Sequence, residues 1–215
     1  MAIGFTTTTL ARMLPDQALR TTFRNYSTLF LLVALVTVTT HLVYGFIFHD
    51  VLEIDELHRF VRGLQGGRTV NGVSSSDLER AEAWRWAVQG VQLFFLPLLV
   101  GAAKRVIERD HKGEVPTVLD ALRHPRSAEK LSFRFGGAEI TTVALGTALA
   151  VATWWLALRI GLLVAEPLPD PWNFIGLPLA EGVAQALGIP FFLGAVVTAG
   201  RAPRRPRRTK TSAHT

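Results

Sequence analysis

The sequence predicts an all-α integral membrane protein, a four-helix bundle built from two helical hairpins. The 215 residues are 49% hydrophobic and only 19% charged, whereas an average soluble domain is about 25% charged. The apolar residues also come in four long blocks, and the charged residues fall between the blocks. This is the pattern of membrane spans rather than of amphipathic soluble helices.

Each block is long enough to cross about 30 Å of hydrocarbon, which takes about 20 helical residues. The predicted spans are about 26–48, 86–106, 139–164 and 174–200. The first exceeds the apolar core of about 7–15 residues in a cleaved signal peptide, so we expect a retained anchor. Residues 1–200 then form one transmembrane domain, and 201–215 form a basic, disordered cytoplasmic tail.

Lysine and arginine counts set the expected orientation, because cytoplasmic loops carry an excess of these residues. Residues 1–25 hold three, 104–138 hold eight and the tail holds six, whereas 49–85 hold five and 165–173 hold none. Both termini are therefore expected in the cytoplasm. Arginine outnumbers lysine 19 to 4, which indicates a high-GC, actinobacterial-like genome. Together with the four spans, this predicts a multi-pass protein of a bacterial inner (plasma) membrane.

Three stretches between or before the spans read as surface helices. Pro116 and Thr117, with Asp120 three residues later, mark the start of a short helix. A similar stretch, LPDQALRTTFRN, precedes the first span, and apolar residues recur at helical spacing over 51–64. The acidic and histidine side chains at 49–56 match no metal-ligand spacing. We therefore expect a solvated acidic face, with no metal and no cofactor.

The basic tail has two interpretations. It contacts anionic lipid, at about 1 kcal/mol per basic residue near the surface, or it simply follows the last span as a disordered segment. The absence of interleaved aromatic residues disfavours nucleic-acid binding. The arginines in question are Arg201, Arg204, Arg205, Arg207 and Arg208.

Two full charges, Arg159 and Glu181, lie inside the third and fourth spans. A charge at the middle of a bilayer costs about 2.5–3.5 kcal/mol, so such residues usually face the bundle interior and pair. In an antiparallel hairpin, residues whose numbers have a constant sum lie at the same level. Arg159 and Glu181 share the sum 340, and we expect them to form a buried ion pair.

Small residues support the same hairpin register. Ala152 and Gly188 also sum to 340, and each lies two turns from the charge on its own span. Ala148 and Ala184 extend them into ladders of small residues, which let membrane helices approach closely. The sequence therefore predicts these four residues at the helix interface.

Other polar residues lie at the same depth as the charges, in the outer half of the membrane. They are His41, Gln89, Gln92 and Gln185. One interpretation is an outward-opening polar site for an anionic headgroup or for proton-linked transport. The simpler one is a buried pair with hydrogen-bonded glutamines that set helix register.

The motifs of common membrane enzymes are missing: the sequence has no Gly-x-Ser-x-Gly elbow, no His-Glu-x-x-His and no phosphate loop. We therefore expect no enzyme. The leading hypothesis is an accessory or stabilising subunit of a larger membrane complex, for which a lipid-transport complex such as an Mce-type importer is conceivable. The alternatives are an oligomeric transporter or a lipid- or anion-binding protein with an outward-facing site, and a membrane enzyme is ranked last. Expected partners are the bilayer and either that complex or further copies of the chain.

The runs ALRTTFRNYSTLFLLVAL and GEVPTVLDALRHP resemble the multi-span membrane domains of bacterial glycerophosphodiester phosphodiesterases and related uncharacterised bacterial membrane proteins. The likeness is confined to these two runs. It implies a helical, multi-span fold, although those domains usually have more than four spans. No hydrolase domain follows in these residues, and no functional residue carries over.

Overall fold

The computed structural model describes residues 7–47, 75–123, 137–165 and 173–200, and every regular element in these ranges is an α-helix. The helices are α1 (Thr7–Arg24), α2 (Tyr26–Ile47), α4 (Ser75–His111), α5 (Val118–Leu122), α6 (Gly137–Ala165) and α7 (Asn173–Gly200). Four of them, within α2, α4, α6 and α7, are long and apolar enough to cross a membrane. The predicted class, an all-α four-helix membrane bundle, is confirmed.

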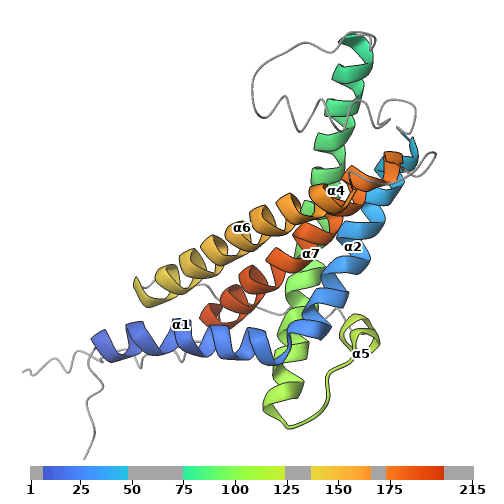
Figure 1. Ribbon diagram of the computed structural model, residues 1–215. Helices are drawn as coiled ribbons and strands as arrows, with labels where there is room; N and C mark the ends of the chain where they lie inside the picture. The colour runs from blue at the N-terminus through green and yellow to red at the C-terminus, as the bar shows by residue number, and fades with distance from the viewer. Residues whose placement is uncertain (1–6, 48–74, 124–136, 166–172, 201–215) are drawn as a thin grey trace, which may run out of the picture.

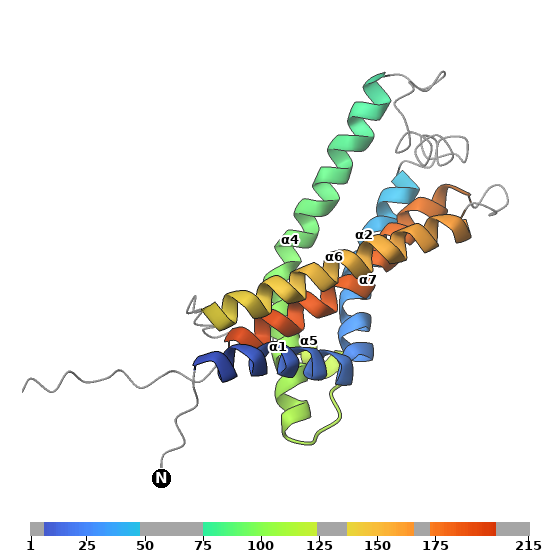
Figure 2. The same cartoon turned by 60° about the vertical axis from the view of Figure 1, so that its left-hand side comes forward.

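The four long helices run up and down the bundle, and α7 lies at the centre (Figure 1). The start of α2, the end of α4, the start of α6 and the end of α7 therefore meet at one end. This end also carries α1, which crosses beneath the bundle, and α5 (Figures 1 and 2). We call it the basic end, because Arg20, Arg24, Lys104, Arg105 and Arg109 lie there, and we call the opposite end the far end.

The helix boundaries agree with the predicted spans except in α4. The predicted span 86–106 lies inside a single helix that begins at Ser75 and ends at His111. The polar residues on either side of the apolar stretch continue the helix, because arginine, lysine and glutamate are good helix formers. The loop helix predicted near 51–64 and the tail after 200 lie outside the described residues.

A polar corner turns α1 away from α2. The side-chain amide of Asn25 donates to the Thr21 carbonyl at 3.0 Å and to Asp110 Oδ2 at 3.1 Å. Arg24 Nε pairs with the other Asp110 oxygen at 2.7 Å. Because Asp110 belongs to the last turn of α4, these contacts fix α1 and α2 to the basic end of α4.

Short helix α5 begins where the sequence predicts. Thr117 is its N-cap, and the Thr117 hydroxyl accepts from the backbone N–H of Asp120 at 3.3 Å. The Asp120 carboxylate then accepts from Arg109 of α4 at 2.9 Å. The capping residue and this ion pair together hold α5 against α4.

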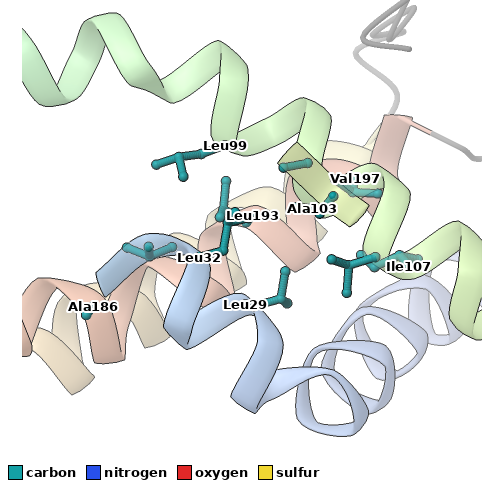
Figure 3. Packing of buried hydrophobic residues seen from close by; sticks show 12 residues of the cluster. Leu29, Leu32, Leu99, Ala103, Ile107, Ala186, Leu193 and Val197 are labelled. Atoms are coloured by element: carbon teal, nitrogen blue, oxygen red, sulfur yellow. The ribbon is translucent and has the colours of Figure 1, made fainter. Parts of the chain in front are cut away.

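An apolar core joins α2, α4 and α7 in the half of the bundle nearest the basic end (Figure 3). Leu29, Leu193 and Val197 are fully buried, and Leu32 and Ile107 are 1% exposed. In a membrane, such side chains stabilise the bundle through close packing and dispersion rather than through removal from water. This core holds three of the four spans in place.

Helices α6 and α7 form a tightly packed hairpin. The Cα of Gly161 lies against Ala180, Gly146 lies against Ala195, and Gly188 lies against the backbone of Ala150. A Cβ on any of these glycines would overlap its neighbour, so the interface depends on the missing side chains. The opposed residues lie within one or two positions of the predicted register.

The prediction of which face of α6 packs on α7 is wrong, although the predicted position of the two helices along each other is approximately right. Ala148 and Ala152 are exposed rather than at the interface. Each lies two positions after an interface residue, Gly146 or Ala150, which is about 200° around a helix. The glycines allow a closer approach than the alanines, and they occupy the interface. On α7 the predicted residues Ala184 and Gly188 are buried.

The far half of α4 stands apart from the other helices (Figure 2). Its large side chains there are exposed: Trp86 by 73%, Leu93 by 66% and Phe94 by 80%. Helix α6 likewise packs on α7 with one face and leaves its other face open. These open faces are mostly apolar, as expected of surfaces in contact with lipid, with Arg159 as an exposed charge on α6.

Candidate functional site: a polar cluster around Glu181

A buried carboxylate lies at the centre of the far half. Glu181 of α7 is 5% exposed, and two basic side chains reach it. Arg85 of α4 donates from Nη2 to Glu181 Oε1, and His41 Nε2 of α2 lies 3.6 Å from Glu181 Oε2. A carboxylate taken out of water needs such partners, because an uncompensated buried charge is strongly destabilising. Three spans therefore meet at this one side chain.

A close crossing of α2 and α7 places His41 beside Glu181. A Cβ on Gly182 would lie 2.9 Å from the Val38 Cα and 3.3 Å from the His41 Cβ. At the same crossing, Thr37 Oγ1 donates to the Gly182 carbonyl at 3.0 Å. Glycine at 182 thus brings the two backbones together directly next to the acidic residue.

Helix α4 supplies the remaining side chains from one face. Arg85 and Gln92 are seven positions apart, which is about two helical turns. Gln92 Nε2 donates to Thr40 Oγ1 at 3.0 Å and lies 3.1 Å from His41 Nδ1. The same His41 nitrogen lies 2.8 Å from the Thr37 carbonyl. The imidazole is thus held by its own helix and by α4.

The cluster lies within the membrane-spanning part of the bundle. His41 is six residues from the last residue of α2, which is about 9 Å at 1.5 Å per residue. At this depth a charge costs free energy unless it pairs or reaches water. The two side chains of the Arg85–Glu181 ion pair are unequally buried: the Glu181 side chain is 7% exposed, whereas the Arg85 side chain is 44% exposed.

The structure brings three of the predicted polar residues together: His41, Gln92 and Glu181. Gln185 lies one turn along α7 from Glu181, and its Oε1 is buried without a hydrogen-bond partner. Gln89 is half-buried on α4, and within the described ranges no hydrogen bond joins it to the cluster.

The predicted pairing of Arg159 with Glu181 is corrected by the structure. Arg159 is exposed, and its guanidinium carbon lies 5.2 Å from the centre of the Trp155 ring. Gly161 faces α7, and Arg159, two positions earlier, lies about 200° around the helix from it. Equal sums of residue numbers give the level of two residues along a hairpin but not the face on which each lies.

The sequence analysis missed Arg85, which it placed in the first loop. A signal for it exists, since Arg85, Gln89 and Gln92 follow the spacing i, i+4, i+7 and form a polar stripe on one face of a helix. Thr37 was also missed, because a threonine on an apolar helix carries no distinctive pattern.

Within the described ranges, no metal-binding group forms part of this cluster. The described ranges contain no group of three or more His, Asp and Glu residues that could hold a metal ion. The residues at 49–56 and the tail arginines, Arg201 to Arg208, lie outside the described residues. Among the described residues, the side chains that meet here are a carboxylate, a guanidinium, an imidazole and neutral hydrogen-bonding groups.

Comparisons with known protein families, with curated proteins and with solved structures found no match for this chain.

Proposed function

We propose that this chain is a membrane carrier whose ligand site is the polar cluster around Glu181. The unequal exposure of Glu181 and Arg85 carries the proposal. If an ion pair only sets helix register, both of its side chains are best buried, because a polar surrounding weakens the attraction between the charges. Here the cation remains reachable beside the open far half of α4, so a ligand can contact it without unfolding the bundle.

A second observation favours a ligand over a purely structural pair. Gln185 Oε1 and Trp154 Nε1 are buried and have no hydrogen-bond partner, although nearly all buried polar groups in proteins have one. Gln185 is one turn along α7 from Glu181. A ligand that donates a hydrogen bond to this amide would complete the site.

The far end is proposed to face the outside of a bacterial inner membrane. Lys104, Arg105 and Arg109 lie at the basic end with α1 and α5, and cationic loops favour the cytoplasm. A reporter inserted in the turn after His111 is expected to be active only in the cytoplasm. Activity of an exported reporter at this position would reverse the orientation.

The carrier proposal is tested by ligand-induced stabilisation of the purified protein. Sodium acetate, sodium phosphate, glycine and choline chloride serve as probes, because a ligand at about 100 times its Kd stabilises a protein by about 2.7 kcal/mol. At least one probe is expected to raise the unfolding temperature of the wild type and of Gln89→Leu, but not of Gln92→Leu. Equal changes in unfolding temperature for all three proteins with every probe would contradict the carrier proposal.

A second candidate is the accessory subunit expected from the sequence. Ala144, Ala148, Ala152, Trp155 and Arg159 are all exposed and share one face of α6. Small residues favour helix association in membranes, and Arg159 favours a partner span with a carboxylate at the same depth. Two copies related by an axis normal to the membrane would oppose Arg159 to itself, which favours a different chain. The lipid importers considered from the sequence stay candidates for that complex.

Purification in mild detergent followed by mass spectrometry tests the subunit hypothesis. A larger membrane protein is expected at a fixed stoichiometry with the wild type, and it is expected to be lost with Arg159→Glu. Recovery of a monodisperse lone oligomer from the wild type would exclude this candidate and leave the carrier proposal in place.

A further inference from the structure

Helix α1 lies across the basic end of the bundle instead of continuing the line of α2 (Figures 1 and 2). Its buried side chains recur at helical spacing, at Leu14, Ala18 and Thr22. At Thr22 the packing is so close that a Cβ on Gly194 of α7 would overlap the hydroxyl. One face of α1 is therefore fixed against α6 and α7, and the other faces away from the bundle.

The end of α1 lies at the level of the apolar part of α7. The Phe23 ring meets the Phe191 ring edge-on, with the ring centres 5.5 Å apart, and the Tyr26 ring lies 5.6 Å from the Phe191 ring. Phe191 lies inside the candidate span Phe174–Gly200, nine residues before its last residue. Phe23 is nevertheless 64% exposed. An exposed aromatic ring at this level is suited to the membrane boundary, where aromatic side chains are enriched.

Helix α5 folds back to a similar level from the end of α4. The Thr28 hydroxyl donates to the Pro116 carbonyl at 3.4 Å, and Thr28 is the third residue of α2. Arg105 of α4 donates from Nη1 to the Asp120 carbonyl at 3.2 Å. These contacts place residues 116–120 beside the start of the first span rather than beyond it.

The side of α5 that faces away from the bundle is apolar. Val118 and Leu122 pack against the core, and Ala121 is buried. Leu119, by contrast, is 68% exposed, and Val115, in the turn before α5, is 85% exposed. A single exposed leucine is ordinary on a soluble protein. Here α5 is held beside the start of a span, so that its exposed side chains have lipid acyl chains to contact.

The same end of the molecule carries an excess of positive charge. Residues 7–24 and 104–123 together hold eight Lys and Arg and five Asp and Glu, which leaves a net charge of +3. Arg20 and Arg24 are exposed one turn apart on α1, and each pairs through Nε with a carboxylate, although a guanidinium has five N–H donors. Basic residues near a membrane surface attract anionic headgroups, by about fivefold in affinity for each residue. The charge of this surface therefore matches an anionic lipid layer.

We infer that α1 and α5 are interfacial helices that bind the anionic lipid surface at the basic end. The side chains of Phe23, Val115 and Leu119 lie among the ends of the acyl chains nearest the headgroups. Arg20 and Arg24 contact the lipid phosphates. Because both helices are fixed to the spans, this binding sets the depth of the bundle in the membrane. This role of α1 and α5 is independent of the carrier function proposed above.

Nitroxide accessibility tests the position of the two helices. The chain has no cysteine, so Phe23→Cys, Val115→Cys and Leu119→Cys each provide a single labelling site in the full-length protein. The labelled proteins are reconstituted in vesicles of phosphatidylcholine and phosphatidylglycerol. Power saturation measures the collisions of each label with molecular oxygen, which concentrates in lipid, and with a water-soluble nickel chelate.

The three labels are expected to collide more often with oxygen than with the chelate, as is a label at Leu163→Cys on the exposed face of α6. Gln17→Cys, on the exposed polar side of α1, is the matched control and is expected to favour the chelate. Val115 lies outside the helices, so its variant tests the position of α5 even where Phe23→Cys disturbs the packing of α1.

Two results of this measurement would overturn the inference. Labels at 115 and 119 that favour the chelate as strongly as Gln17→Cys would place α5 in water. Labels that meet neither reagent would mean that a second copy of the chain or another protein covers this surface instead of lipid.

The preference for anionic lipid is tested with spin-labelled phosphatidylglycerol and phosphatidylcholine. The wild type is expected to immobilise a larger fraction of the phosphatidylglycerol. This preference is expected to fall by up to about fivefold in Arg20→Gln. The matched control is Arg80→Gln, which replaces an exposed arginine at the far end and is expected to keep the wild-type preference. Equal preferences of the three proteins would overturn the assignment of anionic lipid to the basic end.

Discussion

Near the basic end, the contact between α2, α4 and α7 is made by Leu29, Leu193 and Val197, all fully buried. About halfway toward the far end, the same three helices meet instead at Glu181, with His41 and Arg85 around it. The first contact is apolar and closed on all sides. The second is charged and open beside α4.

This difference separates a part of the bundle that is held together by apolar packing from a part that depends on paired charges. Apolar packing holds the helices together without a requirement for charge. A buried carboxylate adds little net stability over an apolar replacement. Under the carrier function proposed above, this carboxylate serves in binding.

The largest expected effect comes from breaking the ion pair on one side only. Arg85→Met is expected to lower the free energy of unfolding by about 3–5 kcal/mol, because the buried Glu181 loses its guanidinium partner and keeps only His41 beside it. Arg159→Met, on the exposed face of α6, is expected to change it by less than about 0.5 kcal/mol. Denaturant unfolding in mixed micelles measures both. An equal loss of unfolding free energy in the two variants would contradict the assignment of Arg85, and not Arg159, as the partner of Glu181.

In the basic half, the comparable change is Leu193→Ala. It is expected to lower the free energy of unfolding by about 2–5 kcal/mol, because the side chain is fully buried and leaves a cavity. The control is Leu163→Ala on α6, where the leucine is 70% exposed and the change is expected to stay within about 0.5 kcal/mol. A Leu193→Ala protein as stable as the control would mean that the core does not hold the spans together.

The crossing next to the cluster is tested with Gly182→Ala. The added Cβ would meet the α2 backbone, so a loss of about 1–3 kcal/mol is expected, together with weaker ligand binding as His41 moves away. Gly90→Ala is the matched control, because nothing lies within 4 Å of its Cβ position. This control is expected to gain up to about 1 kcal/mol of helix propensity. A gain of the same size in both variants would show that α2 and α7 are further apart.

The smallest effect is the acid dependence of α5 at the basic end. The hydrogen bond from the Thr117 hydroxyl, and then the charge of Arg109, lower the pKa of Asp120 below its ordinary value of 3.8. A carboxyl with a lowered folded pKa stabilises the fold above its unfolded value, and this contribution is lost as the pH falls through the folded value. Protection of the α5 amides against hydrogen exchange is expected to persist at pH 3.8 and to decrease below it. Asp120→Asn is expected to show no such decrease.

The spans were predictable because length and apolarity alone decide them. The start of α5 was predictable from the local chemistry of Thr117 and Asp120. The level of the α6–α7 hairpin also followed from the sequence, because two connected antiparallel helices leave little freedom along their axes.

Which face of each helix packs against its neighbour was not predictable in the same way. Whether Arg159 or Arg85 reaches Glu181 depends on the rotation of α6 about its axis, and Gly146 and Gly161 fix that rotation by allowing close contact with α7. Two apolar helices with several small residues each can pack on more than one face. The choice among the faces is made by the fit of the whole interface rather than by any one residue.

The central claim is that Arg85, and not Arg159, balances Glu181. A pair of double-mutant cycles tests it most directly, with Arg85→Met and Glu181→Gln in one and Arg159→Met and Glu181→Gln in the other. The first cycle is expected to give a coupling free energy of about 1–3 kcal/mol, and the second is expected to be additive within about 0.5 kcal/mol. Strong coupling in the Arg159 cycle, with additivity in the Arg85 cycle, would contradict the account.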